Sequence, residues 1–379
     1  MNKQIGKKRK NYILKLILLI ILYGNFILLY FNNKNKTLEF LFNYIYKSKA
    51  FELFQNYSRN NSFEIIQNYK NKIKTFEFLI YHEFNTKINN QINLDYENFN
   101  FAVIRTPCEF CGLISNYNLF LGCIRKYMIK GFIPIFDLES YKNIINGFIV
   151  DPLKGNPWEY YFNQPFGYQY SNVKKKAKNI QYFKCFENIG PNEDIFLNKE
   201  SMNYWQNFAS KYIPIKIEII KESNFIIRRI FNESRNVLGV LLRGTDYVAK
   251  KPYRHPIPPK TKDAIKDVKL LDNKNKYDWI FLATEDNFIR EEFIRAVGTK
   301  VKCLLNKNKI YYNYSKKQYL AYNIDFKINK EYNKIYLLNI IILSKCLDFL
   351  AARTTGSIGV FVLTKGFRNY KVYNLGHYK

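Results

Sequence analysis

The sequence is poor in the side chains that hold metal ions. It contains three histidines, His82, His255 and His377, which lie far apart along the chain, and no two aspartates are separated by a single residue. Cys108 and Cys111 form a C-x-x-C pair, but a zinc site needs further ligands at similar range, and a fourth is missing. We therefore expect no metal centre.

Cysteine is also scarce. Six cysteines in a chain of 379 residues are too few for a disulfide scaffold. A disulfide among Cys108, Cys111 and Cys123 is expected if this part of the chain lies in an oxidising lumen. Buried free thiols are the alternative, and the sequence leaves the two open.

Acidic residues are few, since 31 Asp and Glu stand against 60 Lys and Arg, and the formal net charge is +29. An excess of this size is typical of nucleic-acid-binding proteins. However, the basic residues are spread evenly and form no arginine-rich stripe. We expect no specific nucleic-acid partner, and the charge fits attraction of an anionic ligand or a membrane surface instead.

Long apolar runs are rare as well. Residues 12–31 are almost wholly apolar, and about 20 helical residues just span a bilayer. A basic tail, residues 1–11, precedes this run, and no small-residue cleavage pattern follows it. These features predict an uncleaved transmembrane signal anchor with a cytosolic amino terminus. The next most apolar window, residues 335–350, is interrupted by Asn339, Lys345 and Asp348, so it is expected in a protein core.

Beyond the anchor, the sequence predicts a stem and two α/β domains. Residues 32–95, rich in Asn, Lys, Phe and Glu, are interpreted as the stem. Residues 96–225 begin with a strand–helix–strand pattern (101–104, 119–129 and 132–136) that indicates a βαβ unit. A loop-rich stretch, 150–200, carries an aromatic cluster at 156–162, which is either a sugar-stacking surface or a satellite core. No repeat of solenoid period is visible.

Residues 226–379 alternate between strands and helices, as expected of a second doubly wound α/β unit. Strands are predicted at 237–242, 279–283, 301–305, 348–352 and 372–375. Helices are predicted after Pro258-Pro259 and at 287–296, 331–344 and 358–363, while 201–231 is helical with a break at Pro214.

The first of these strands ends in the most informative motif of the chain. Residues 237–242 are apolar and β-branched, and they lead directly into Arg243-Gly244-Thr245-Asp246. Open α/β sheets place ligand-binding groups at the carboxyl ends of their strands. The planar fork of arginine donates two parallel hydrogen bonds and suits a diphosphate. The alternative is a strand end that carries a surface Arg–Asp pair.

Four motifs together resemble the α1,6-fucosyltransferases, a family that includes the vertebrate core fucosyltransferase and the rhizobial nodulation fucosyltransferase. Leu242–Val248 with His255-Pro256-Ile257 resembles the donor-binding motif. Residues 280–286 are similar to a strand that ends in Ala-Thr-Asp-Asp in the family. Residues 343–357 resemble the third motif, and Cys111-Gly112-Leu113 resembles the Cys-Gly turn of the first domain. Their order and spacing agree over residues 100–379.

The resemblance implies a fold, a donor and a set of binding residues. The fold is α/β, with two facing Rossmann-like doubly wound domains (GT-B-like), here behind the transmembrane helix. The donor is GDP-fucose or another GDP-sugar, used without a metal or other cofactor, and the acceptor is a glycan. Arg243 takes the diphosphate, with Asp246 as the nearest carboxylate for general-base work. The implied donor-binding residues are Gly112, Arg243, Thr245, His255, Thr284, Glu285, Asp286, Thr354, Thr355, Gly356 and Ser357.

Two of these groups have plain structural alternatives. Thr354-Thr355-Gly356-Ser357 opens a run that is predicted to be helical, so its hydroxyls and amides either bind phosphate or form an ordinary helix N-cap. Glu285 and Asp286 follow a predicted strand, and the resemblance implies that they accept hydrogen bonds from guanosine. For His255, which the resemblance implies contacts the donor, the alternative is an exposed histidine in a loop.

This chain also departs from the family. Gly244 replaces a second arginine, Tyr247 replaces a lysine, Lys251 aligns with the proposed catalytic glutamate, and Asn339 aligns with an aspartate. The GDP-sugar site therefore carries over better than the acceptor chemistry, and the chitobiose core of N-glycans is not the expected acceptor.

The predicted function is a membrane-anchored inverting glycosyltransferase, with fucose as the leading sugar. The alternative is a non-catalytic sugar-binding membrane protein on a decayed glycosyltransferase fold. Residues 12–31 would make it a single-pass protein, type II and Golgi-like in a eukaryote or in the inner membrane of a bacterium.

Overall fold

The computed structural model describes residues 96–106, 108–148, 150–185, 189–244, 247–248, 251–304 and 326–379. The expected basic tail, anchor and stem, residues 1–95, lie outside this range, and so do Thr245 and Asp246. No helix in the described ranges is long and apolar enough to cross a membrane.

The amino-terminal part of the described chain forms a parallel three-stranded sheet with strand order β2-β1-β3. Its strands are β1 (Asn100–Arg105), β2 (Ile133–Phe136) and β3 (Asn179–Lys184), and α5 (Leu113–Ile129) connects the first two. The sequence pattern did not predict β3, because this edge strand, Asn-Ile-Gln-Tyr-Phe-Lys, exposes most of its residues and lacks an apolar run. Short elements link β2 to β3: η1 (Ile144–Asn146), η2 (Pro152–Lys154), η3 (Pro157–Tyr160), η4 (Pro165–Gly167) and α6 (Tyr170–Lys176).

Three further elements lead to the second sheet. They are η5 (Glu193–Phe196), α7 (Lys199–Tyr212) and α8 (Ile217–Phe231). The predicted helical break at Pro214 lies between α7 and α8. Helix α7 is capped by Asn198, whose side chain accepts hydrogen bonds from the amides of Glu200 and Ser201.

The second sheet has five parallel strands in the order β6-β5-β4-β7-β8. They are β4 (Val237–Leu241), β5 (Trp279–Ala283), β6 (Val301–Lys302), β7 (Asp348–Ala352) and β8 (Asn369–Tyr373); the last begins three residues and ends two residues earlier than predicted. The intervening helices are α10 (Thr261–Asn275), α11 (Asn287–Val297), α12 (Phe326–Leu343) and α13 (Thr355–Leu363). The strand order reverses direction between β4 and β7, and this point of an open sheet is where ligands bind.

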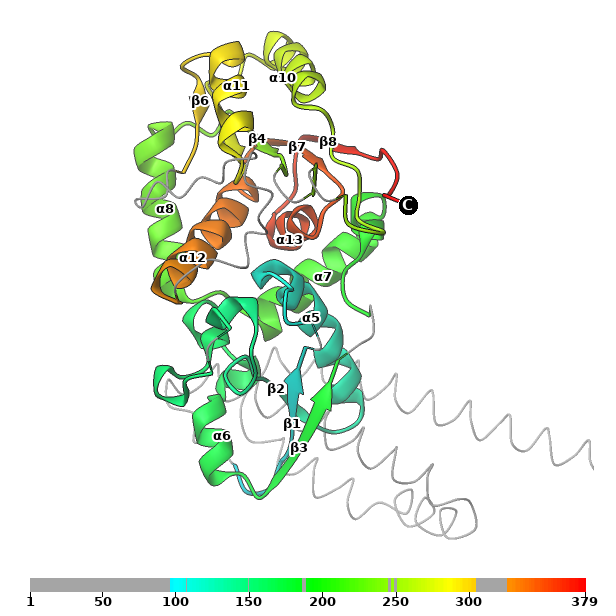
Figure 1. Ribbon diagram of the computed structural model, residues 1–379, viewed down its shortest axis with the longest axis vertical. Helices are drawn as coiled ribbons and strands as arrows, with labels where there is room; N and C mark the ends of the chain where they lie inside the picture. The colour runs from blue at the N-terminus through cyan, green and yellow to red at the C-terminus, as the bar shows by residue number, and fades with distance from the viewer. Residues whose placement is uncertain are drawn as a thin grey trace, which may run out of the picture. The chain divides into compact units, whose positions relative to one another are not determined.

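Helices cover both faces of the second sheet (Figure 1). On one face, Leu238, Val240 and Leu242 pack with buried residues of α10 and α11. On the other face, Val237 and Leu241 belong to a cluster that includes residues of α12, α13 and the first sheet. Strands buried on both faces need near-continuous apolar sequence, and this explains why β4 and β7 were predicted correctly from their sequences.

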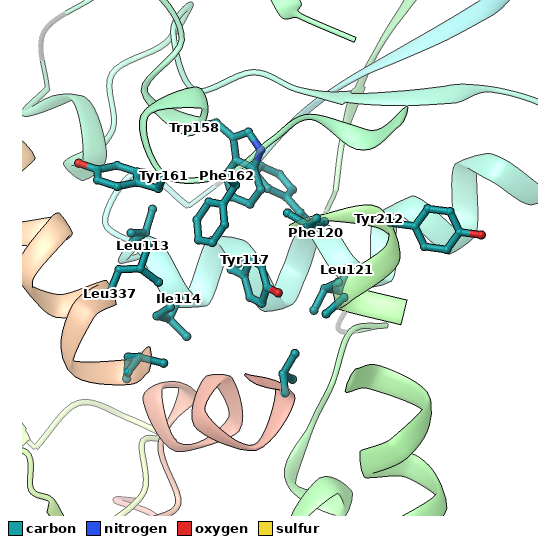
Figure 2. Packing of buried hydrophobic residues seen from close by; sticks show 14 of the residues in the cluster. Leu113, Ile114, Tyr117, Phe120, Leu121, Trp158, Tyr161, Phe162, Tyr212 and Leu337 are labelled. Atoms are coloured by element: carbon teal, nitrogen blue, oxygen red, sulfur yellow. The ribbon is translucent and has the colours of Figure 1, made fainter. Parts of the chain in front are cut away.

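The aromatic cluster at 156–162 belongs to the core of the first sheet (Figure 2). Trp158 and Phe162 are fully buried. The Trp158 ring centroid lies 4.4 Å from that of Phe162, and the Phe162 centroid lies 4.8 Å from that of Tyr117 on α5. The enclosed rings of Trp158 and Phe162 present no face to a sugar, which favours the core alternative, and Tyr160 of the same cluster is half-buried.

Four of the six cysteines form disulfides. Cys108 pairs with Cys111, within the loop after β1, and Cys123 of α5 pairs with Cys185, which follows β3. Cys303 and Cys346 are free. The expectation of a disulfide among Cys108, Cys111 and Cys123 agrees with the first pair, while the partner of Cys123 was not foreseen because β3 was not predicted.

Candidate functional site

Two arginines follow the two strands that flank the reversal of strand order. Leu241 of β4 is in register with Ala351 of β7. Arg243 and Arg353 each stand two residues further along, so they occupy equivalent positions at the carboxyl edge of the sheet. This edge holds most of the residues that the sequence predicted to bind a donor.

Arg243 is held from two sides. Its Nε lies 3.3 Å from Oε1 of Glu285, and the two side chains are only 18 % and 8 % exposed. Its guanidinium carbon lies 4.8 Å from the ring centroid of Tyr247. Glu285 also accepts a hydrogen bond from the amide of Gly244 at 3.0 Å. Glu285 therefore positions the arginine and the backbone that follows it.

The row of side chains continues from Tyr247 to His255. Their rings meet edge to face with centroids 5.2 Å apart, and the His255 side chain is exposed. The carboxyl terminus fixes the backbone of this loop, because the Tyr378 amide donates to the His255 carbonyl at 2.9 Å and the Arg254 amide donates to the Tyr378 carbonyl at 3.0 Å. The predicted His255 thus stands in the same row as Arg243.

Asp286, in contrast, is buried and caps helix α11. Its side chain accepts hydrogen bonds from the amides of Phe288 at 2.9 Å and Ile289 at 3.3 Å, and the residue is 2 % exposed. Thr284 supports this turn by accepting a hydrogen bond from the Asp286 amide at 3.2 Å. Asp286 thus serves as an N-cap, a role that its residue type fills well, and its contact with guanosine stays a prediction.

Gly244 is required by the same aspartate. A Cβ atom at position 244 would lie 2.6 Å from the Cβ of Asp286, closer than packed carbon atoms approach. The structure therefore explains why no second arginine follows Arg243 in this chain.

The hydroxyls of the Thr354–Ser357 turn are used within the protein. The Thr354 hydroxyl accepts a hydrogen bond from the Ser357 amide at 3.2 Å, and the Ser357 hydroxyl donates to the Ala352 carbonyl at 2.6 Å. Both residues are buried, as is Gly356, whereas Thr355 is half-buried. Thr354 is the N-cap residue of α13, and phosphate binding at this turn stays a prediction in which Thr355 and backbone groups are the more accessible contacts.

The Gly112 turn lies close to the amino terminus of α13. Gly112 is the N-cap residue of α5, and six residues further on Asn118 donates a hydrogen bond to the Thr355 carbonyl at 3.2 Å. Gly359 of α13 packs tightly on Ile114, since a Cβ there would collide with the Ile114 side chain. The predicted Gly112 and Thr355 are thereby brought to neighbouring helix ends.

Tyr336 on α12 was not predicted from the sequence to belong to the site. Burial raises the pKa of its hydroxyl to about 12; the positive charge of Arg243 opposes the rise, while Tyr247 and Glu285 add to it. Its hydroxyl oxygen lies 2.7 Å from the point where a Cβ on Gly356 would stand. The hydroxyl is therefore protonated at neutral pH. It lies beside the side chains of Arg243, Tyr247 and Glu285 and beside the Thr354–Ser357 turn. No sequence signal distinguished this tyrosine within an apolar helix.

Arg353 was also missed. Its Nη1 lies 2.9 Å from Oε2 of Glu193, and its side chain is 18 % exposed. Its Nε is buried and has no hydrogen-bond partner among the described residues. Glu193 also lies 3.4 Å from Nε2 of His377. A usable signal was present, because Arg353, like Arg243, is an isolated arginine directly after a buried strand.

No protein-family model matches the chain, and no curated protein sequence does. Solved structures do match. NodZ α1,6-fucosyltransferase soaked with GDP-fucose is 12 % identical, with 70 % of this chain and 93 % of that chain covered and a TM-score of 0.39. Fucosyltransferase NodZ from Bradyrhizobium is 13 % identical, with 70 % of this chain and 92 % of that chain covered and a TM-score of 0.43. POFUT1 in complex with GDP is 10 % identical, with 73 % of this chain and 99 % of that chain covered and a TM-score of 0.42.

The two NodZ structures are fucosyltransferases by their names. Because all three TM-scores are below 0.5, the likeness carries no weight for activity, which has to be argued from the residues of the site.

The chemistry open to this site is that of an anion held by fixed cations. Arg243 and Arg353 are the cationic side chains at the strand ends, with Tyr247, Tyr336 and Thr355 near them. The described residues contain no group of three or more His, Cys, Asp or Glu side chains that could hold a metal ion. The site therefore offers guanidinium groups, hydroxyls and backbone amides to a negatively charged ligand.

Proposed function

We propose that the protein is a membrane-anchored inverting glycosyltransferase that transfers a sugar, with fucose from GDP-fucose as the leading candidate, to a glycan acceptor. The observation that carries this proposal is Arg243. It stands at the carboxyl end of β4, at the reversal of strand order, and is held by Glu285 and Tyr247. The order of the motifs around it supports a GDP-sugar as the donor.

The proposed reaction is a single displacement. The acceptor hydroxyl attacks the anomeric carbon, the bond from that carbon to the diphosphate oxygen breaks, and GDP leaves with the electron pair. Asp246 is the proposed base that takes the hydroxyl proton. Arg243 stabilises the charge that builds on the departing diphosphate; its side chain is already held in place, so little reorganisation is needed during the reaction.

The proposed architecture is of the GT-B type. In this arrangement residues 226–379 bind the nucleotide sugar and residues 96–225 face the acceptor. The parallel sheets of the two parts and the contact of α5 with α13 support the arrangement. The reversal between β4 and β7 supports a nucleotide site on the second sheet.

The proposed location is a membrane, through residues 12–31, with the folded part on the side opposite the cytosol. The disulfides Cys108–Cys111 and Cys123–Cys185 support this side, because disulfides persist in oxidising compartments. For a eukaryotic cell this means a type II protein of the secretory pathway; in a bacterium the protein would lie in the inner membrane with its folded part in the cytosol, where GDP-sugars are found.

A second candidate is a non-catalytic sugar-binding membrane protein. Lys251 favours it, because this exposed residue aligns with the proposed catalytic glutamate of the resembling family and cannot act as the same base. The binding groups at Arg243 would be retained in such a protein, and only the transfer would be lost.

One experiment separates the two candidates. The purified full-length protein is incubated with GDP-fucose, and the release of GDP and of fucose is followed over time. An enzyme releases GDP, with or without an acceptor, and the Arg243→Ala variant does not. Binding of GDP-fucose without GDP release would support the non-catalytic candidate, and the absence of binding would contradict both.

A further inference from the structure

We propose that Arg353 is a second cation that binds the diphosphate of the donor beside Arg243. This inference rests on the proposed function and assigns one more residue to the same site. It is carried by the register of two strands, by the partners of the Arg353 side chain and by the charge of the ligand.

The register places the two arginines on the same side of the sheet. Leu241 and Ala351 are paired and belong to the same buried cluster, whereas Val240 and Leu350 belong to the cluster on the opposite face. Successive side chains of a strand alternate between faces. Arg243 and Arg353, each two residues beyond the paired residues, therefore emerge toward the face of the sheet that α12 and α13 cover.

The spacing of the strands suits a ligand that bridges the two arginines. Paired backbones in a sheet lie about 4.8 Å apart, and a guanidinium reaches several ångströms from its Cα. Two phosphate groups joined by one oxygen can therefore contact a guanidinium from each strand. Arg243 is the guanidinium on β4 and Arg353 is the one on β7.

The Arg353 side chain has donors left for a ligand. Nη1 of Arg353 donates a hydrogen bond to the Glu193 carboxylate. The buried Nε has no hydrogen-bond partner in the described part of the chain. A buried donor without an acceptor is costly, and most such groups in proteins are satisfied by protein, water or ligand. A phosphate oxygen is a strong acceptor that would satisfy it.

The charge of the ligand calls for more than one cation. A nucleoside diphosphate carries more than one negative charge at neutral pH, and its leaving oxygen gains charge as the sugar departs. Position 244 cannot supply a side chain, because Asp286 occupies the space of its Cβ. Arg353, on the neighbouring strand, is the arginine at the equivalent position.

The plain alternative is that Arg353 is only a structural anchor that ties Glu193 of η5 to the end of β7. A structural role would affect all ligands alike, whereas a phosphate-binding role affects them according to their phosphates. Binding of GDP, GMP and guanosine to the full-length protein, measured by calorimetry, distinguishes the two. The variants are Arg353→Gln, Arg353→Lys, and Arg235→Gln as a control.

Arg235 is a matched control because it is exposed and precedes β4, at the opposite end of the strand from Arg243. We expect wild type and Arg235→Gln to prefer GDP over GMP by the same factor. Arg353→Gln should reduce that factor about tenfold or more, the range for one charged hydrogen bond, and leave guanosine binding unchanged. Arg353→Lys keeps a charge that can pair with Glu193 but loses the fork, so its factor should also fall.

An unchanged preference for GDP over GMP in folded Arg353→Gln would overturn the inference, and so would an equal loss of GDP and guanosine binding. If Arg353→Gln does not fold, Arg353→Lys decides in the same way: a reduced factor supports the inference and an unchanged factor overturns it. The proposed function fails separately, because it is contradicted if the wild type binds neither GDP nor GDP-fucose.

Discussion

Arg243 is positioned before any ligand binds. The Glu285 carboxylate and the Tyr247 ring lie on its guanidinium, and groups fixed in this way stabilise a transition state without having to reorganise. A planar fork in a fixed orientation donates two parallel hydrogen bonds, which the ammonium group of lysine cannot reproduce.

Arg243→Lys should therefore lose activity although it keeps the charge. We expect a cost of roughly 2–4 kcal/mol in transition-state stabilisation, a hundredfold or more in rate, measured as kcat/KM for GDP-fucose. Arg235→Lys, at the amino end of the same strand, is the control and should match the wild type. Near-normal turnover by Arg243→Ala would contradict the assignment.

Gly244 is predicted to be needed for packing. In Gly244→Ala the new methyl group meets the Asp286 side chain, and overpacking of this kind costs typically 1–3 kcal/mol. We expect that loss in the free energy of unfolding, measured in urea. Asp286→Gly removes all three of the colliding atoms and leaves a residue type that N-cap positions tolerate, so Gly244→Ala should cost much less in that background. An equal cost in both backgrounds would show that Asp286 is not the cause.

The residue types alone could not separate binding groups from caps. Arg243 was predictable because a buried apolar strand ends abruptly at it. Asp286 and Thr354 also follow strands, but aspartate and threonine are equally good N-cap residues, and the structure uses them in this way. Only the coordinates of the neighbouring amides decide between the two roles.

At the scale of elements, the sequence predicted buried strands such as β4 and β7 and missed the exposed edge strand β3. β4 and β7 are apolar throughout because helices cover both of their faces, whereas β3 is an edge strand with mostly exposed residues. The pairing of β4 with β7 joins segments about 110 residues apart, and no local pattern contains that register. The place of Tyr336 and Arg353 beside Arg243 depends on this register, although the position of Arg353 directly after a buried strand was a local signal.

Asp348 links several elements at the amino end of β7. This buried carboxylate accepts hydrogen bonds from Arg368 at 3.1 and 2.6 Å, from the Asn369 amide at 2.9 Å and from the Tyr277 hydroxyl. Burial alone would raise its pKa, but the hydrogen bonds from Arg368, Tyr277 and Asn369 outweigh burial and lower the pKa below its ordinary value of 3.8.

A lowered pKa in the folded state has a defined effect on stability. The contribution of Asp348 to the free energy of unfolding is fully present above the pKa of this carboxyl in the unfolded chain, near pH 4. It is lost as the pH falls through the lower pKa of the folded state. Asp348→Asn should therefore cost about 1–3 kcal/mol at pH 6, and the difference from wild type should shrink below pH 4. Unfolding free energies measured between pH 2 and pH 7 test this, with the exposed Asp263→Asn as control. A difference that stays constant over this range would contradict it.

At the scale of the whole molecule, the cations that face the donor are expected to be side chains and not metal ions. The sequence has no Asp-x-Asp, and Arg243 supplies a fixed positive charge. Turnover of GDP-fucose should therefore be unchanged after treatment with a chelator. Activity that is lost on chelation and restored by added Mn²⁺ or Mg²⁺ would overturn this prediction.

The remaining property of the whole chain is its attachment to the membrane. The apolar window at 335–350 overlaps α12, whose residues Leu337, Leu338 and Ile340 to Leu343 are buried in the core. Lys345 and Asp348 follow it, and each charge at a bilayer centre would cost about 2.5–3.5 kcal/mol. This segment therefore belongs to the protein core and does not insert into a membrane. Residues 12–31 remain the predicted anchor.

A chain that begins at residue 36 should accordingly be soluble and folded, while the full-length chain should resist extraction from membranes. Carbonate extraction of both forms tests this, because it releases peripheral proteins and leaves inserted ones in the pellet. Retention of the shortened chain in the pellet would mean that a second segment inserts. Release of the full-length chain would mean that residues 12–31 do not span the bilayer, and the proposed glycosyltransferase would then reach its acceptor from solution.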